Sequence, residues 1–237
     1  FLNSIAPIVH ITDINRAREL GIVAPYYIFN VELPLSKDSQ KKYDEIIKAY
    51  TFYESQLGGR IRAFSTASYI IKTIKPIPKA DRTDSQKALL HKANMYWAMM
   101  QRRKQFLYNC EEKVQACKEI LDMYPEKKAL IFSKTISFAT KLNENIKSCA
   151  LYHSKMSKED RKITLRMFDT NAVRIISAVD ALNAGFNVPE CSLAICAAGT
   201  SKWLEMIQRA GRISRKMEGK VAIFVNLYMK DTQDIKW

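Results

Sequence analysis

The chain has 237 residues, 47% of them hydrophobic, which is enough to bury a core of its own. Lysine and arginine total 38 against 24 acidic residues, a formal net charge of +14 that favours an anionic partner, with nucleic acid preferred over a membrane surface. No apolar run approaches the roughly 20 residues of a membrane span, so we expect no membrane partner.

The five cysteines contain no C-x-x-C pair. This pattern predicts neither a disulfide framework nor a zinc site, and we expect no bound metal ligated by this chain. Reduced thiols predict a cytoplasmic protein, in the cytoplasm of a bacterial host if a phage encodes it. The chain begins with Phe1 and shows no signal peptide pattern, so it is interpreted as a piece of a longer protein.

The first predicted elements are a strand and a helix. Residues 26–34, YYIFNVELP, alternate apolar side chains as a strand does, and helix signals follow from Ser36. The region from Arg60 to Cys110 is different, because it holds eleven Lys or Arg and only two acids. Two prolines in KPIPKADRTD interrupt it, and HKANMYWAMMQRRKQFLYN then predicts a helix. We interpret residues 58–118 as a basic helical insertion in, or lead-in to, an α/β domain.

From about residue 127 onward, short apolar runs alternate with longer polar or amphipathic stretches. The runs are ALIF (129–132), CALY (149–152), VRIISA (173–178), SLAIC (192–196) and VAIFVN (221–226). Runs this short and unbroken are typical of strands buried on both faces of a parallel sheet. The predicted fold class is therefore α/β, a doubly wound parallel sheet flanked by helices, with ligands at the carboxyl ends of the strands.

Helices are predicted between these strands, at 133–147, 157–168 and 201–210. In the second, Ser157 with Asp160 predicts an N-terminal cap. Ile163, Met167 and Phe168 predict its apolar stripe.

Polar segments follow four of the predicted strands. Ser133-Lys134-Thr135 ends the first at a helix start, where an anion can bind. YHSKMSKEDR places His153 and Lys155 after the second, and a structural role for His153 is favoured over a phosphate contact. SAVDALNAGFNVPE (177–190) follows the third and carries Ser177, Asp180, Gly185 and Asn187.

The segment QRAGRISR, residues 208–215, follows the fourth and holds Gln208, Arg209, Arg212 and Arg215 around one glycine. Arginines spaced by three lie near one face of a helix start or tight turn and repel one another. A polyphosphate would relieve that repulsion. From these residues alone, a solvated charged face and a phosphate site both remain open.

Together the four segments resemble motifs IV, V and VI of the C-terminal RecA-like domain of superfamily 2 helicases. ALIFSKT resembles motif IV, YHSKMSKEDR the segment after it, SAVDALNAGFNVP motif V and QRAGRISR motif VI. IAPIVH and GIVAPYYIFNVEL further resemble the junction between the two RecA-like halves in the repair and recombination branch, which includes phage helicases of the UvsW type. The basic middle region resembles nothing identified.

The resemblance implies a domain order. Residues 1–25 would be the end of the first RecA-like half and the linker, 26–57 the start of the second RecA-like domain, and 119–237 its core. The N-terminal RecA-like half of the same protein would be a partner, in a monomer.

The resemblance also implies roles around ATP and Mg²⁺, which the N-terminal half would mainly hold. Arg212 and Arg215 would be arginine fingers at the γ-phosphate, and Gln208 would orient nucleotide or water. Asp180, Gly185, Asn187 and Arg209 would line the nucleotide site. For Arg209, a purely structural role remains open.

The resemblance implies nucleic acid contacts as well, to DNA in preference to RNA. Family positions facing the backbone are Ser133, Lys134, Lys155 and Ser177, and Thr200 would cap the expected helix 201–210 and then contact the backbone. The predicted helix near Trp97 carries Arg102, Arg103 and Lys104, which we expect to be exposed and to bind phosphates. Whether Trp97 packs in the core or stacks on bases remains open.

Two departures from the family pattern matter. Motif V has Val179-Asp180 where the family has threonine-aspartate, so a hydroxyl is missing and Ser177 is the substitute. Asn187 stands where many relatives carry aspartate.

The phosphate-cradle sequences are also missing. No G-x-x-x-x-G-K-[ST] and no D-E-x-[DH] occurs, so this chain alone is expected not to hydrolyse ATP. The sequence thus predicts the C-terminal half of an ATP-dependent helicase. The alternatives are a duplex translocase subunit of a restriction or remodelling complex and a non-catalytic nucleic acid binding or annealing module.

Overall fold

The structure is a computed structural model that describes residues 25–179, 191–198 and 221–236. The chain divides into two compact units. One, here called the sheet unit, comprises Phe1–Leu33 and Lys113–Trp237, and the other, the helical unit, comprises Pro34–Glu112.

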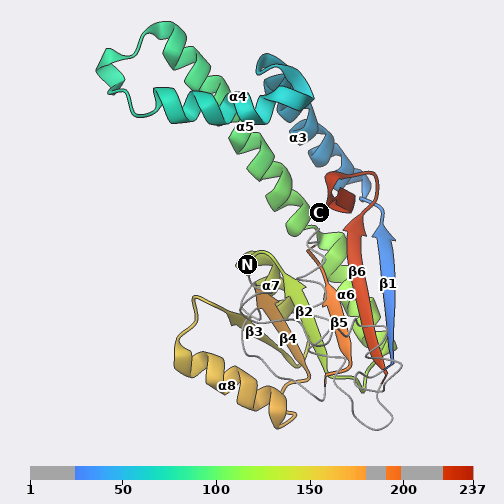
Figure 1. Ribbon diagram of the computed structural model, residues 1–237. Helices are drawn as coiled ribbons and strands as arrows, with labels where there is room; N and C mark the ends of the chain where they lie inside the picture. Colours follow the sequence, from blue (N-terminus) through green and yellow to red (C-terminus); the bar gives the residue numbers. More distant parts are fainter. Residues whose placement is uncertain (1–24, 180–190, 199–220, 237) are drawn as a thin grey trace, which may run out of the picture. The chain divides into compact units, whose positions relative to one another are not determined.

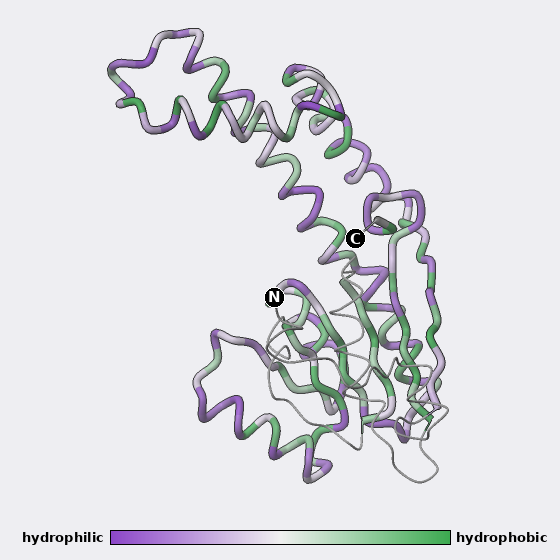
Figure 2. Tube along the Cα trace, viewed as in Figure 1, coloured by the Kyte–Doolittle hydropathy of each residue, from purple (hydrophilic) through white to green (hydrophobic). Residues whose placement is uncertain are grey.

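The sheet unit is built on a six-stranded parallel sheet with the order β1-β6-β5-β2-β4-β3 (Figure 1). The strands are β1 (Tyr26–Leu33), β2 (Ala129–Ser133), β3 (Cys149–His153), β4 (Ile175–Val179), β5 (Leu193–Cys196) and β6 (Ala222–Met229). Every residue of β2, β4 and β5 is buried, which is why these strands read as unbroken apolar runs. The same strands are predominantly green in Figure 2.

Helices cover both faces of this sheet, and each face has its own apolar core. α6 (Glu111–Met123) and α7 (Ile136–Asn145) pack on one face, where Leu121 and Phe138 are buried against Ile131 and Ile195. α8 (Lys158–Asp169) packs on the other through Phe168, against Leu130 and Phe224. A short 3₁₀ helix, η3 (Gln233–Lys236), follows β6. The prediction of an α/β parallel sheet flanked by helices is confirmed.

The start of α8 was predicted correctly, but its buried face was not. The Ser157 hydroxyl accepts a hydrogen bond from the Asp160 backbone N–H at 3.0 Å, which confirms the cap. Ile163 and Met167 are 55% and 39% exposed, so the predicted stripe is wrong for both. The prediction is confirmed for Phe168, and Thr164 is buried in place of the other two, because the face that meets the sheet is rotated from the apolar pattern.

The helical unit consists of α3 (Lys37–Gln56), α4 (Gly59–Ile74), the 3₁₀ turn η1 (Lys79–Asp81) and α5 (Asp84–Tyr108). Gly58 and Gly59 have φ of 95° and 75°, a left-handed backbone that lets the chain turn sharply between α3 and α4. The core joins Leu57, Ala67 and Ile70 to Leu90 and Tyr96 of α5. No described helix is both long and apolar enough to cross a bilayer.

This unit differs in extent from the predicted insertion at 58–118. It begins at Pro34 and ends at Glu112. α3 belongs to it because that helix packs against both α4 and α5.

Candidate functional site at the carboxyl edge of the sheet

The polar segments predicted from sequence begin side by side at one edge of the sheet. β5, β2, β4 and β3 are neighbours in the sheet and run parallel, so their carboxyl ends lie together. Ser133 pairs with Val179, which in turn pairs with His153, and Phe132 pairs with Cys196. The strands that precede residues 180–190 and 199–220 therefore end at the same edge at which Lys134 and Ser154 lie.

Ser133 is the last residue of β2 and is only 2% exposed. Its hydroxyl is within hydrogen-bond distance of the Ala178 carbonyl at 3.2 Å and of the Thr135 carbonyl at 3.4 Å. It therefore ties β2 to β4 within the sheet. Lys134 beside it is half-buried, and Thr135 caps α7 by accepting from the Phe138 N–H at 3.2 Å. A nucleic acid contact by Ser133 would require this hydroxyl to leave Ala178.

The turn after β3 carries the most accessible cation of this edge among the described residues. Lys155 is exposed, as is Ser154. The His153 carbonyl accepts from the Met156 N–H at 3.2 Å and its own N–H points to the Met156 sulfur at 3.4 Å, so the turn is closed on itself. His153 Nδ1 is buried and has no hydrogen-bond partner among the described residues. Lys155 is thus placed where an anion can reach it.

Ser177 lies inside the sheet and not at its edge. It is the third residue of β4, paired with Ile131 and Leu151, and it is fully buried. Its hydroxyl has no hydrogen-bond partner among the described residues. The predicted nucleic acid contact of Ser177 stays a prediction, and it would require this fully buried side chain to become accessible.

The residues predicted around the nucleotide lie outside the described residues. They are Asp180, Gly185, Asn187, Thr200, Gln208, Arg209, Arg212 and Arg215. Their roles stay predictions.

The three basic residues of α5 were expected to be exposed, and this was wrong for two of them. Arg102 is exposed, whereas Arg103 and Lys104 are half-buried. The Arg103 guanidinium carbon lies 4.2 Å from the centroid of the Tyr50 ring, so it packs α5 onto α3. Tyr50 also contacts the hydroxyl of Tyr96 at 3.3 Å and donates to Glu54 at 2.8 Å. Burial and these hydrogen bonds raise the pKa of Tyr50.

Trp97, which the sequence left open, packs against the core of the helical unit. Its ring centroid lies 5.1 Å from that of Phe64 on α4 and 6.5 Å from that of Tyr96. Its indole N–H is buried. Trp97 is half-buried by these contacts, and the more exposed aromatic side chains nearby are Phe64 and Tyr69 of α4, which sequence reasoning missed.

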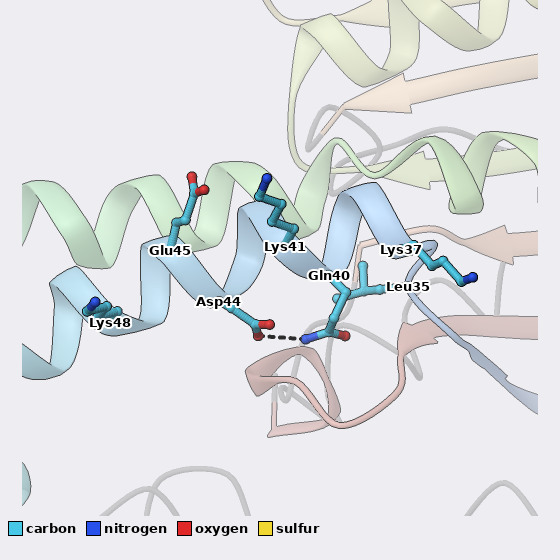
Figure 3. A pocket seen from close by; sticks show the side chains of 7 residues that line it. All are labelled: Leu35, Lys37, Gln40, Lys41, Asp44, Glu45 and Lys48. Atoms are coloured by element: carbon cyan, nitrogen blue, oxygen red, sulfur yellow. Dashed lines mark hydrogen bonds between the residues drawn. The ribbon is translucent and has the colours of Figure 1, made fainter.

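A hollow of about 620 Å³ lies beside the start of α3 (Figure 3). Its lining mixes Lys37, Lys41 and Lys48 with Asp44 and Glu45, and Gln40 donates to Asp44 at 2.7 Å. Opposite charges this close offer no field of one sign to a ligand. Within the described ranges, no group of three His, Cys, Asp or Glu side chains is placed to hold a metal ion.

Residues 112–217 match the family described as helicase conserved C-terminal domain. This part of the chain is therefore similar to helicase C-terminal domains. The match starts where the sheet unit resumes after the helical unit, so the helical unit lies outside the matched residues, apart from Glu112.

Known proteins resemble the chain over different extents. The DNA 3'-5' translocase XPB2 of Sulfurisphaera tokodaii is 24% identical over 214 residues, which cover 90% of this chain and 45% of XPB2. The DEAD-box ATP-dependent RNA helicase RhpA of Helicobacter pylori is 27% identical over 119 residues, covering 47% and 24%. The chain thus spans less than half the length of these relatives.

The structure of the C-terminal part of the Fun30 ATPase domain shares the fold, with a TM-score of 0.59 and 15% identity over 90% of this chain and 88% of that one. The named relatives act on DNA in one case and on RNA in the other, so they leave DNA and RNA undecided. Kinship to UvsW-type helicases stays a prediction.

Proposed function

We propose that this chain is the C-terminal half of an ATP-dependent superfamily 2 DNA helicase or translocase. One observation carries the proposal. The four segments that resemble helicase motifs follow β2, β3, β4 and β5, and these four strands are contiguous in the sheet. Parallel sheets bind ligands at this edge, outside the carboxyl ends of the strands.

The described residues at this edge suit an anion. Ser133-Lys134-Thr135 and His153-Ser154-Lys155 bring two lysines to the ends of β2 and β3 and contain no carboxylate. Such residues fit a polyphosphate or a nucleic acid backbone but supply no carboxylate ligand for Mg²⁺. ATP, when bound with its metal by the N-terminal half, supplies the phosphoryl group that is transferred to water. A role in DNA repair or recombination is proposed only because the sequence resembles helicases of that branch.

The role proposed for the segment QRAGRISR is electrostatic stabilisation of the phosphates. Arg212 and Arg215 present planar, permanently charged guanidinium groups to the developing charge on the phosphates, and Gln208 orients nucleotide or water. Asp180, Gly185, Asn187 and Arg209 complete the nucleotide side. Lys134, Lys155 and Thr200 lie on the nucleic acid side.

The test is an alanine substitution in the full-length protein. Arg212→Ala or Arg215→Ala should lower ATP turnover by on the order of 10³-fold while nucleic acid affinity changes little, because an arginine finger acts on the transition state. Arg166→Ala, an exposed arginine of α8, is the control and should change neither quantity. The present chain alone should show no ATPase activity. Weakened binding with unchanged turnover would move these arginines to the nucleic acid site.

Translocation on duplex without strand separation is the second candidate, favoured by the likeness to a protein named a DNA translocase. A strand-displacement assay with the full-length protein separates the two candidates. Displacement supports the helicase, and ATP-driven movement without displacement supports the translocase.

A further inference from the structure

One side of α4 in the helical unit is exposed and carries both basic and large apolar side chains. The helix packs on α5 through a buried side that includes Ala63, Ala67, Ile70 and Ile74. The opposite side is exposed and holds Ile61, Arg62, Ser65, Tyr69 and Lys72, here called the α4 strip. These positions repeat at spacings of three, four and seven, so they follow one side of the helix for about 16 Å.

The positive charges of α4 have no partner in the described part of the chain. The helix carries Arg60, Arg62 and Lys72 and no acidic residue, and none of the three makes an ion pair with a described residue. Unpaired cations of one sign on a helix face attract an external anion.

Several other basic residues of the helical unit are already engaged. Arg82 donates to the carbonyls of Ile77 and Lys75 at 2.8 and 2.7 Å and so holds the turn between α4 and α5. Lys87 pairs with Asp84 at 3.0 Å, and Arg103 packs on Tyr50. Lys75, Lys79 and Arg102 are exposed as well, but α4 differs from α3 and α5 because it holds no acidic residue beside its cations.

Large apolar side chains lie among these cations. Ile61 is 93% exposed and Tyr69 is 69% exposed. The hydroxyls of Ser65 and Thr73 donate to carbonyls of their own helix, at 2.9 and 2.8 Å, so they do not compete for a ligand. Exposed rings between cations are the arrangement with which proteins stack unpaired bases and neutralise the phosphates beside them.

We propose that the α4 strip binds single-stranded nucleic acid, with a base stacked on Tyr69 and phosphates beside Arg62 and Lys72. The inference rests on the proposed nucleic acid function and narrows it to a surface and a strand form. In a duplex the bases stack on one another, so the Tyr69 ring gains nothing there. Duplex therefore meets only the charges of the strip.

The experiment measures fluorescence anisotropy of labelled oligo-dT, oligo-rU and a duplex of the same length with the present chain. Tyr69→Ala should weaken single-strand binding roughly fivefold to a hundredfold, the range for loss of one base–aromatic stack. Tyr69→Phe keeps the ring and should bind like the wild type, which also separates stacking from misfolding. Phe52→Ala removes a comparably exposed ring from α3 and should have no effect.

A second pair of variants tests the phosphate contacts. Arg62→Ala with Lys72→Ala should reduce the slope of log affinity against log salt by about 1.4, at roughly 0.7 per phosphate for a single strand. Lys41→Ala with Lys42→Ala is the control, because α3 mixes its lysines with Asp38, Asp44 and Glu45.

The outcomes separate this inference from the proposed function. Unchanged single-strand binding by Tyr69→Ala, with a wild-type chain that does bind, overturns the α4 strip alone. If Tyr69→Ala loses the same affinity for duplex as for single strand, base stacking on Tyr69 is overturned. A wild-type chain that binds none of the three probes overturns the strip and the nucleic acid function together. If Tyr69→Ala loses affinity for oligo-dT, oligo-rU or both but not for duplex, the result supports single-strand binding by the α4 strip.

Discussion

The Lys113 ammonium nitrogen lies 2.6 Å from Oδ2 of Asp234, and both side chains are fully buried. The same oxygen accepts a hydrogen bond from the Met229 N–H at 2.9 Å. The pair therefore joins α6, the end of β6 and η3 at one polar point inside the sheet unit. Removing one partner leaves the other charge buried without compensation.

Lys113→Ala should lower the free energy of unfolding by about 3–5 kcal/mol, measured by urea denaturation. The double variant Lys113→Met with Asp234→Leu should lose less than either single variant, because it leaves no buried charge. Lys87→Ala breaks an exposed pair and should cost less than about 1 kcal/mol. Equal effects of Lys113→Ala and Lys87→Ala would contradict the role of the buried pair.

Arg103 and Arg102 are neighbours in sequence, but replacing them should affect stability to different degrees. Arg103→Ala should lower the stability of the helical unit by about 1–2 kcal/mol, because the guanidinium packs on Tyr50. Arg103→Lys should not restore it, since an ammonium group lacks the planar fork. Arg102→Ala should change stability by less than about 0.5 kcal/mol. Thermal melts of the three variants check this, and matching melts for both alanine variants would refute it.

Glu112 should make the helical unit sensitive to acid. Burial alone would raise its pKa, but hydrogen bonds from Ser39 and from the Ser36 N–H at 3.0 Å outweigh burial and lower the pKa below 4.5. The unfolded chain therefore binds this proton more tightly. The stabilisation is fully present above the ordinary pKa and is lost as the pH falls through the folded pKa.

Urea denaturation at neutral and acidic pH measures this effect. Glu112→Gln should reduce the stability lost on acidification, whereas the exposed control Asp81→Asn should not. An identical pH dependence of the wild type and Glu112→Gln would exclude this carboxylate as a source.

The five thiols of the folded protein should react slowly with a thiol reagent at about pH 8. Four of them are buried and Cys149 is half-buried. Burial raises the pKa of Cys117 above its ordinary value and that of Cys149 to about 12, so little thiolate forms. The reagent's absorbance should report five thiols only after denaturation. Ser154→Cys, at an exposed turn, should add one fast thiol, and a fast thiol in the unmodified folded chain would contradict the prediction.

The sheet was predictable because its strands are buried on both faces. Five apolar runs coincide with β2 to β6 to within a few residues, and no competing helix pattern of the same length exists there. Helix capping was predictable too, because Ser157 and Asp160 interact through local backbone geometry. Features that depend on nearby residues, or on burial of both faces of a strand, can therefore be predicted from the sequence.

Packing between residues that are far apart in the sequence could not be predicted in this way. The burial of Arg103 depends on Tyr50, which belongs to a different helix, and the burial of Ser177 depends on what packs on its face of the sheet. The α4 strip was hidden for the opposite reason. Its exposed Ile61 and Tyr69 look like core residues until Ala63 and Ala67 are seen to face α5.

The parallel pairing of β1 with β6 has a consequence for how the chain folds. Asn226 donates to Asn30 across 196 residues, so β1 has no strand to pair with until β6 has been synthesised. At 5–20 residues per second, this delay is roughly ten to forty seconds on the ribosome. Tyr27, Ile28 and Phe29 are exposed even in the finished sheet. During synthesis, β1 thus presents exposed apolar side chains and an unpaired edge, which favour aggregation until β6 is made.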